Sequence, residues 1–309
     1  MQRVRKLTLD FQHHTSKAAV KAAMPFFLPP HEAMASLRVL HIHSAWLTVD
    51  LFVRMLARIP LLESLRPLYE GWGRQHTRSS ATAHLRRLSH VELRVSYPVL
   101  SALCSALTWP GSCRFTLAGM DDGTRNWRRL VTCTLPTTVA RAVDNRFKRV
   151  TLEAFHTGVE LILDECADSG WWTTWDDLEN PSRFLIEGRD ARIWPVCDAL
   201  VLPLSQSFSN LQVMVLQISS FAQDPVTEIA WVALLRSMPL KKLSVADVRP
   251  EPEGPPRFWN AALLAAILQV FAAQPLDVLF LSSSFSLPSS LLQELRSSAR
   301  EIQLINIEM

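Results

Sequence analysis

The stretches LQVMVL (211–216), LKKLSV (240–245) and LDVLFL (276–281) repeat one spacing of apolar residues, L-x-x-L-x-L. In each stretch the last two apolar residues alternate along a short strand, and the first lies where the chain enters the core. A single strand and helix cannot bury their apolar faces alone, whereas stacked copies can. The spacing therefore predicts a repeat architecture.

The segments between these strands have the apolar periodicity of amphipathic helices. Apolar residues recur at i, i+3, i+4 and i+7 in two of them, namely Trp231, Leu234, Leu235 and Met238, and Leu264, Ile267, Leu268 and Phe271. The same alternation of strand and helix occurs earlier, with strands that contain Leu7, Leu40, Val91 and Phe115. An ordinary α/β sheet with leucine-rich strands is the alternative interpretation.

We therefore predict an α/β fold in the form of an irregular leucine-rich-repeat solenoid. This horseshoe has a largely parallel, curved sheet inside and helices outside. One repeat domain is expected over residues 1–309. Breaks in the pattern predict insertions at about 69–84, 119–147, 164–182 and 249–257.

Composition is typical of a folded protein, because 48% of the 309 residues are hydrophobic and 20% are charged. The formal net charge is only +3, with 26 Arg and 6 Lys, so charge alone does not indicate a nucleic-acid partner. The five cysteines are far apart and form no C-x-x-C, which argues against a disulfide framework or a zinc site. A reducing compartment, cytoplasm or nucleus, is expected.

Membrane insertion is not predicted. No apolar segment follows the basic residues at the start of the chain, so a secretory signal is not indicated. The longest apolar stretch, 258–276, contains no charge, but it is interrupted by Asn260, Gln269, Gln274 and Pro275. A buried helix within the repeat pattern explains it better than a membrane span.

Motifs for catalysis or cofactor binding are absent from the sequence. Neither nucleotide-binding glycine loop occurs, and there is no G-x-S-x-G and no H-E-x-x-H. His41 and His43 are spaced to ligate a metal, but no third ligand lies near them in the sequence. We predict a protein that is not an enzyme and has no cofactor or metal.

Charge is strongly segregated in the middle of the chain. Residues 125–149 contain seven basic residues and one acid, whereas 150–182 contain eight acids and no Lys or Arg. The two blocks could neutralise each other, or each could be solvated. A calcium loop is not indicated, because D-x-[DN]-x-[DN]-G is missing. RNA binding by the Arg-rich block remains a weaker alternative, since few aromatic residues that could stack on bases, such as Trp127, lie among its arginines.

A binding surface is predicted on the side of the sheet that faces away from the core. Period-2 alternation assigns to this concave face His41, His43, Glu92, Arg94, Arg114, Thr151, Glu153, Gln217 and Phe280. It would be a mixed polar surface with one exposed aromatic residue. A second candidate is the tryptophan cluster Trp171, Trp172 and Trp175, which either contacts a partner or seals the edge of the solenoid.

Three longer segments suggest a family: LRVLHIHSAWLTVDLFVRMLARIPLLESL (37–65), LRRLSHVELRVSYPVLSALCSALTWP (85–110) and WVALLRSMPLKKLSV (231–245). They resemble the leucine-rich-repeat region of fungal, basidiomycete-type F-box proteins. The resemblance implies a module that recognises substrates for a cullin ubiquitin ligase. No F-box-like helical segment precedes Val4, so we expect an adaptor to bind only through an upstream F-box. A stand-alone interaction scaffold is the alternative.

Overall fold

The computed structural model describes the chain in segments: residues 4–10, 34–43, 48–68, 79–120, 147–155, 158–165, 182–187, 210–218, 228–247, 261–282 and 288–305. The chain divides into two compact units. Unit 1 comprises residues 1–144 and 182–187, and unit 2 comprises 145–181 and 188–309. We describe each unit by itself, and a single repeat domain stays a prediction.

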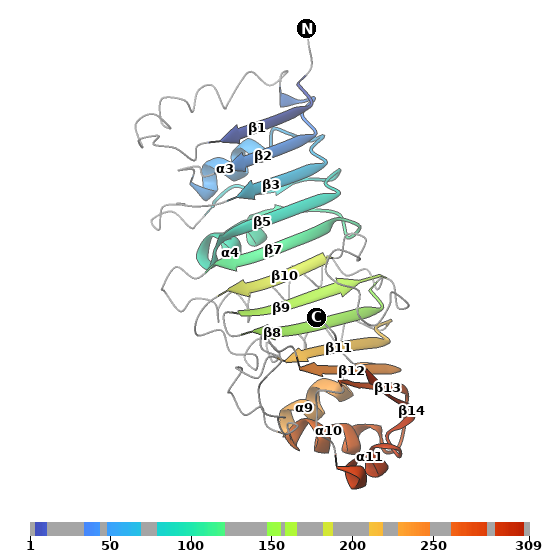
Figure 1. Cartoon of the computed structure of the whole chain (residues 1–309). Coiled ribbons are helices and arrows are strands. Elements are labelled where there is room, and N and C mark those ends of the chain that lie inside the picture. Colours follow the sequence, from blue (N-terminus) through green and yellow to red (C-terminus); the bar gives the residue numbers. More distant parts are fainter. Residues whose placement is uncertain are drawn as a thin grey trace. The chain divides into compact units, whose positions relative to one another are not determined.

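Unit 1 contains six parallel strands that lie side by side in sequence order (Figure 1). They are β1 (Lys6–Asp10), β2 (Val39–His43), β3 (Ser64–Leu68), β5 (His90–Ser96), β7 (Arg114–Met120) and β10 (Ser182–Glu187). The register aligns the predicted core positions, since Leu40 pairs with Leu65, Leu65 with Val91, and Val91 with Phe115. All four side chains are buried.

In the described part of unit 1, two helices pack on the sheet. Helix α3 (Val49–Leu56) buries Val49, Phe52, Val53 and Leu56, which have the spacing of one helical stripe. Helix α4 (Tyr97–Ala106) packs on α3 and against β5 and β7. A short second sheet pairs β4 (Ala83–His84) with β6 (Leu107–Thr108) in parallel. The predicted insertion at 69–84 therefore ends in regular structure.

The same turn precedes successive strands in unit 1. A backbone bond closes it from Leu37 N to Met34 O, from Leu62 N to Ile59 O, and from Leu88 N to Leu85 O. The three leucines are buried, and so are Leu211 and Leu276 in unit 2, which confirms the prediction for these repeats, whereas Leu240 is only partly buried. The carbonyl one residue after the leucine accepts from two successive amides of the next repeat, because Glu63 and Ser64 both donate to Arg38 O, and Ser89 and His90 both donate to Glu63 O. This repeated bond fixes the register between neighbours.

Unit 2 contains six more strands, in the spatial order β9, β8, β11, β12, β13, β14. Their bounds are Gly158–Asp164 (β9), Arg149–Phe155 (β8), Val213–Ile218 (β11), Lys242–Asp247 (β12), Leu276–Ser282 (β13) and Ala299–Ile305 (β14). Five of these strands, β8, β11, β12, β13 and β14, run parallel to one another. Met214, Leu243 and Leu279 on three of them are aligned and buried. The three L-x-x-L-x-L stretches thus form adjacent strands in register.

An antiparallel hairpin departs from the predicted topology. Strands β8 and β9 pair antiparallel, with Arg149 opposite Asp164 and Glu153 opposite Glu160. Only two residues separate the strands, a connection too short for a parallel pair. The spacing predicts a largely parallel sheet, and the strand at 158–164 is not among the predicted ones. The hairpin brings the end of the basic block beside the first residues of the acidic block.

Three helices lie in the described part of unit 2: α9 (Glu228–Arg236), α10 (Ala261–Phe271) and α11 (Ser289–Leu295). Helix α10 packs against both α9 and α11. Its 11 residues lie within the apolar stretch at 258–276, and β13 begins at Leu276, so this stretch is a buried helix followed by a strand. Among the described residues no helix is long and apolar enough to cross a membrane.

The fold is therefore a mixed α/β structure with a large, mainly parallel β-structure and few helices. Twelve strands contribute to it, six in each unit. The curvature of a horseshoe stays a prediction. The predicted insertions at 119–147, 164–182 and 249–257 lie almost entirely outside the described residues.

Candidate functional site

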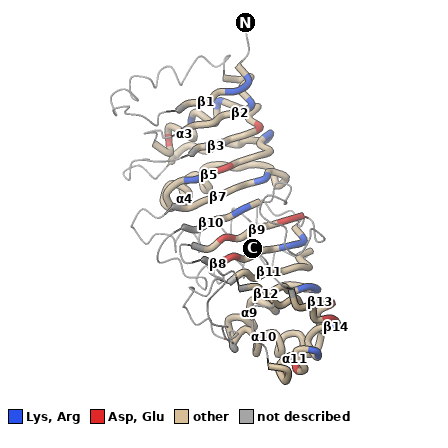
Figure 2. The backbone as a smooth tube through the Cα atoms, viewed as in Figure 1, with Lys and Arg blue, Asp and Glu red and all other residues tan. Residues whose placement is uncertain are grey.

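One face of the unit 1 sheet is covered by helices, and the opposite face carries polar and charged side chains. Along β5, Val91, Leu93 and Val95 are buried. Between them, Glu92 is partly exposed and Arg94 is exposed. Figure 2 shows Lys, Arg and acidic residues distributed over the unit 1 strands. We call this surface the outer face of unit 1. It contains four of the predicted binding residues: His41, Glu92, Arg94 and Arg114.

The strand register arranges these residues in rows. One row runs across all six strands of the unit 1 sheet and contains one residue from each: Thr8, His41, Arg66, Glu92, Thr116 and Arg183. Arg94 lies two residues farther along β5, and Arg114 lies beside His90 at the opposite end of that strand. Arg66 and Arg183 were not predicted from the sequence.

Glu92 is held between two arginines at the centre of the outer face. Its Oε2 lies 2.9 Å from Arg66 Nε, and its Oε1 lies 3.0 Å from Arg94 Nε. The carboxylate side chain is 23% exposed, whereas the two guanidinium side chains are 45% and 51% exposed. The acid is thus partly covered, and the cations that flank it remain accessible to solvent.

Other cations extend the positive charge of this face. Lys6 is exposed, and Arg114 and Arg183 are partly exposed. Within the described part of the chain, the Arg114 side chain makes no ion pair. By alternation two further acids belong to this face, Asp10 and Glu187, which are the last residues of β1 and β10.

The four predicted binding residues in unit 2 have a different environment. Phe280 is 1% exposed, Thr151 is 5% exposed and Glu153 is 8% exposed, and Gln217 is partly exposed. The prediction of one exposed aromatic residue is therefore wrong, because Phe280 is buried. Thr151 and Glu153 are also buried rather than solvent-facing.

The reason is that the central strands of unit 2 are buried on both faces. In β11, Val213 and Val215 are buried as completely as Met214 and Leu216. Beside Val215 in the register lies Ser244, which is fully buried and pairs with Phe280. A continuous apolar run such as VMVL is typical of a strand buried on both sides, and this signal was available in the sequence.

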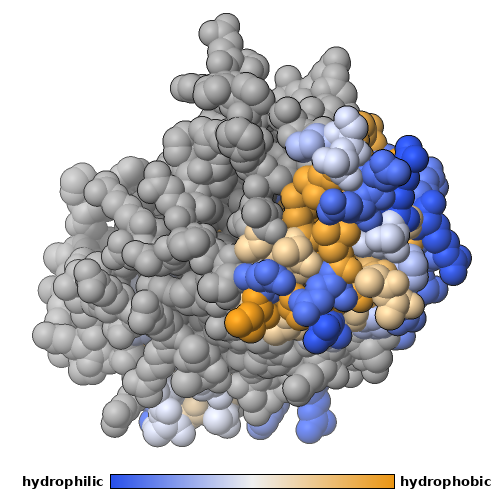
Figure 3. Space-filling model, turned by 90° about the horizontal axis from the view of Figure 1, so that it is seen from below, coloured by the Kyte–Doolittle hydropathy of each residue, from blue (hydrophilic) through white to orange (hydrophobic). Residues whose placement is uncertain are grey.

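The edge strand of unit 2 exposes apolar residues. Leu304, on β14, is 57% exposed, although its neighbour Leu281 on β13 is fully buried. Figure 3 shows the molecule from below, where the described residues present hydrophobic residues next to hydrophilic ones. Nothing in the described residues shows what covers Leu304.

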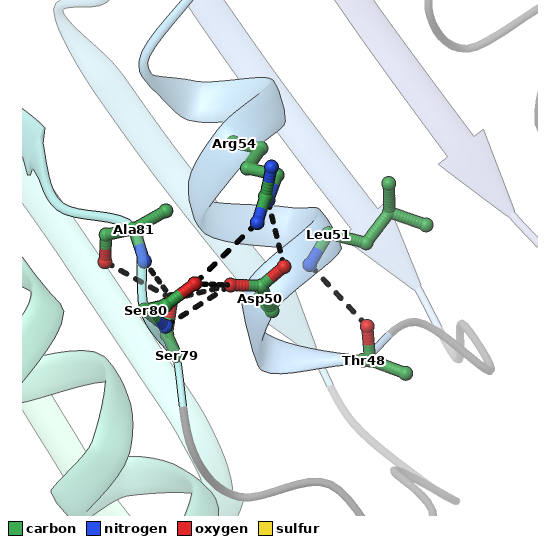
Figure 4. A network of polar contacts seen from close by, with 7 residues as sticks. All are labelled: Thr48, Asp50, Leu51, Arg54, Ser79, Ser80 and Ala81. Carbon is green, nitrogen blue, oxygen red and sulfur yellow. Dashed lines mark hydrogen bonds and ion pairs between the residues drawn. The ribbon is translucent and has the colours of Figure 1, made fainter.

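A second polar network lies on the helical side of unit 1 (Figure 4). Asp50 Oδ2 accepts from Arg54 Nε at 2.7 Å, and Asp50 Oδ1 accepts from the Ser80 amide at 3.1 Å. The hydrogen bond from Arg54 is the largest cause of a lowered pKa of Asp50, and the Ser80 bonds act in the same direction. Together these contacts join α3 to the segment that leads into β4, so the network has a structural role.

Several candidate residues remain untested. Trp171, Trp172 and Trp175 lie outside the described residues, and the side chain of His43 is not described. Within the described segments no group of three or more His, Cys, Asp or Glu could hold a metal ion. Cys104 and Cys113, the two cysteines among these segments, are buried.

No protein-family model matches the chain, and no curated protein matches it. The structure itself defines a mixed α/β protein with a mainly parallel sheet. Unit 1 of this protein exposes a sheet face that carries charged residues. The resemblance to F-box repeats depends on the quoted segments alone.

Proposed function

We propose that the chain is a protein-binding leucine-rich-repeat module that recognises substrates for an F-box-type cullin ubiquitin ligase. In this proposal the module has no catalytic site of its own and acts in the cytoplasm or nucleus. An adaptor subunit would bind through an F-box in the same polypeptide or a partner, and the repeats would bind the target.

The observation that carries the proposal is the outer face of unit 1. Six parallel strands lie side by side in unit 1, and the same turn precedes several of them. The side chains on the outer face therefore form rows across the strands, and these side chains do not contribute to the core. Extended sheet faces of this kind are the binding surfaces of repeat proteins. The resemblance of 37–65, 85–110 and 231–245 to F-box repeats supports the connection to ubiquitin ligases.

Two other functions remain as alternatives. A stand-alone interaction scaffold would use the same face without any ligase subunit. RNA binding by the Arg-rich block at 125–149 is less well supported, because most of the block lies outside the described residues and Arg149 is buried in β8.

The test is affinity purification of the tagged full-length gene product from its own cells, followed by mass spectrometry. We expect a cullin and its adaptor to co-purify with additional target proteins. Replacing Arg94 and Arg114 together by Glu should remove the targets but retain the ligase subunits. Arg86→Glu with Arg87→Glu is the matched control, because both residues are exposed and lie in the turn before β5.

Melting temperatures distinguish loss of binding from loss of folding. Arg94 contributes one exposed ion pair, which is typically worth about 0–1 kcal/mol, so Arg94→Glu with Arg114→Glu should melt close to wild type. Recovery of targets without any cullin or adaptor would favour the scaffold. Unchanged target recovery by the folded double variant would remove the outer face of unit 1 from the proposal and direct attention to Trp171–Trp175.

A further inference from the structure

We propose that the outer face of unit 1 binds an acidic, extended segment of a partner protein, whose carboxylates are bound by Arg66, Arg94 and Arg114. This inference rests on the proposed protein-binding function and specifies the chemistry of the partner. Glu92 acts in it as a positioning residue that orients two of the three arginines.

The first argument is the charge of the face. Across the three central strands β3, β5 and β7, the charged side chains are Arg66, Arg94 and Arg114 against the single acid Glu92. The formal sum is therefore 3 − 1 = +2 on three adjacent strands. A partner of complementary, negative charge is attracted to such a surface and oriented on it.

The second argument concerns the hydrogen-bonding groups that Glu92 leaves available. Both of its contacts involve the Nε of an arginine, at 2.9 Å for Arg66 and 3.0 Å for Arg94. A guanidinium has five N–H donors, and four of them belong to the two terminal nitrogens. Because the side chains of Arg66 and Arg94 are about half exposed, these terminal nitrogens can bind an incoming carboxylate through two parallel hydrogen bonds.

Glu92 also lowers the entropic cost of binding. A free arginine side chain populates many rotamers, and it loses this conformational freedom when it is fixed in one geometry. An arginine already held by its Nε loses less of that freedom when a ligand arrives. Two guanidinium groups held by one carboxylate are therefore better prepared for an anion than two unrestrained arginines.

The third argument is the spacing of the three cations. Neighbouring strands are about 4.8 Å apart, and residues two apart on a strand are about 6.6 Å apart. From the register, the Cα atoms of Arg66 and Arg94 are thus about 8 Å apart, and those of Arg66 and Arg114 about 12 Å apart. An extended chain covers these distances in about two to four residues. The matching ligand is a segment of about eight residues with an acid at every second or fourth position.

A nucleic acid fits this surface less well than an acidic peptide. The outer-face positions of β2, β3, β5 and β7 include no Phe, Tyr or Trp on which bases could stack. A carboxylate-rich peptide needs only separate arginine contacts, and the face provides these.

The experiment uses the purified full-length chain and fluorescein-labelled eight-residue peptides in fluorescence anisotropy. The probe is (Glu-Ser)4, and (Gln-Ser)4 and an eight-nucleotide oligouridylate are the comparisons. We expect binding of (Glu-Ser)4 that exceeds both comparisons by about tenfold or more, because charge-assisted hydrogen bonds are worth roughly that factor each. Equal or tighter binding of the oligouridylate would overturn the proposal in favour of a nucleic acid.

Variants test which residues bind the peptide. Arg66→Gln, Arg94→Gln and Arg114→Gln should each weaken (Glu-Ser)4 binding about tenfold. The double variant Arg86→Gln/Arg87→Gln, which loses two positive charges elsewhere on unit 1, should change it less than twofold. If this control weakens binding as much as the face variants, net charge explains the attraction and the proposed site is wrong.

Glu92→Gln separates positioning from simple attraction. Removing this acid makes the face more positive, so attraction by net charge alone predicts tighter binding of (Glu-Ser)4. Positioning by Glu92 predicts weaker binding, by about threefold or more, because the two guanidinium groups lose their shared partner. Tighter binding would overturn the role assigned to Glu92.

The result is distinguishable from a failure of the proposed function. A chain that binds no acidic peptide but retains cullin, adaptor and targets in cells would contradict only the partner chemistry. A chain that binds (Glu-Ser)4 through Arg66 and Arg94 but retains no ligase subunit would contradict only the ubiquitin role.

Discussion

Replacing Phe280 by Ala is expected to lower the free energy of unfolding of unit 2 by about 3–5 kcal/mol. The Phe280 side chain lies in the middle of β13, between Ser244 of β12 and Gln303 of β14, and is 1% exposed. Removing its ring withdraws a large apolar surface from the core and leaves a cavity that the rigid neighbouring strands fill only in part. An exposed phenylalanine at the same position would change stability by no more than about 0.5 kcal/mol.

Urea unfolding followed by circular dichroism measures this difference. With a slope of about 2 kcal/mol per molar urea, a loss of 3–5 kcal/mol lowers the midpoint by roughly 1.5–2.5 M. Leu304→Ala is the matched control, since Leu304 lies on the adjacent strand and is 57% exposed, and it should shift the midpoint by less than 0.5 M, about 1 kcal/mol. A midpoint for Phe280→Ala within 0.3 M of wild type, roughly the effect of an exposed site, would show that the burial of the second sheet face is wrong.

Two further predictions concern α3. The lowered pKa of Asp50 means that its charged form stabilises the folded state, so this contribution is present above the unfolded-state pKa near 3.9 and is lost as the pH falls through the folded-state pKa. Asp50→Asn should therefore melt below wild type at pH 7, and the two melting curves should converge in acid; a constant difference from pH 7 to pH 2.5 would contradict this. The Thr48 hydroxyl accepts from the Leu51 amide at 3.3 Å as the N-cap, so Thr48→Ala should cost about 1 kcal/mol in urea unfolding while Thr48→Ser costs less.

The repeated core could be predicted because its spacing follows directly from the geometry of strands and helices. Trp231, Leu234 and Leu235 form the buried stripe of a helix, and Leu216 and Leu281 are buried in strands, as period and spacing indicated. The spacing also limits the register, since a slip of one residue would turn the side chains of a strand to the other face, and Met214, Leu243 and Leu279 are aligned as it requires.

The hairpin β8–β9 was missed although its sequence contains the signal. In GVELILD (158–164), Val159, Leu161 and Leu163 recur at every second position, which is the period of a strand, although Ile162 between them is also buried. In the sequence, the high density of acids in 150–182 obscures this strand pattern. Phe280 was misplaced for a related reason, because period-2 alternation was assumed to mean that one face is always exposed.

Arg66 illustrates what a repeat pattern does not contain. Its unit, Leu62-x-x-Leu65-x-Pro67, has proline at the last core position, and the β3–β5 pairs omit Arg66 and Pro67, as expected where a residue has no N–H to donate. The Arg66–Glu92 ion pair connects the strands at that place.

Core positions in such a fold are constrained by packing, whereas outer-face positions are constrained only by what they bind, since an exposed ion pair adds little stability. Three arginines and one acid on β3, β5 and β7 are therefore not explained by the repeat. The stability of the fold does not explain why one carboxylate is shared by two half-exposed guanidinium groups. Binding of an acidic ligand explains it, and fluorescence anisotropy can measure that binding.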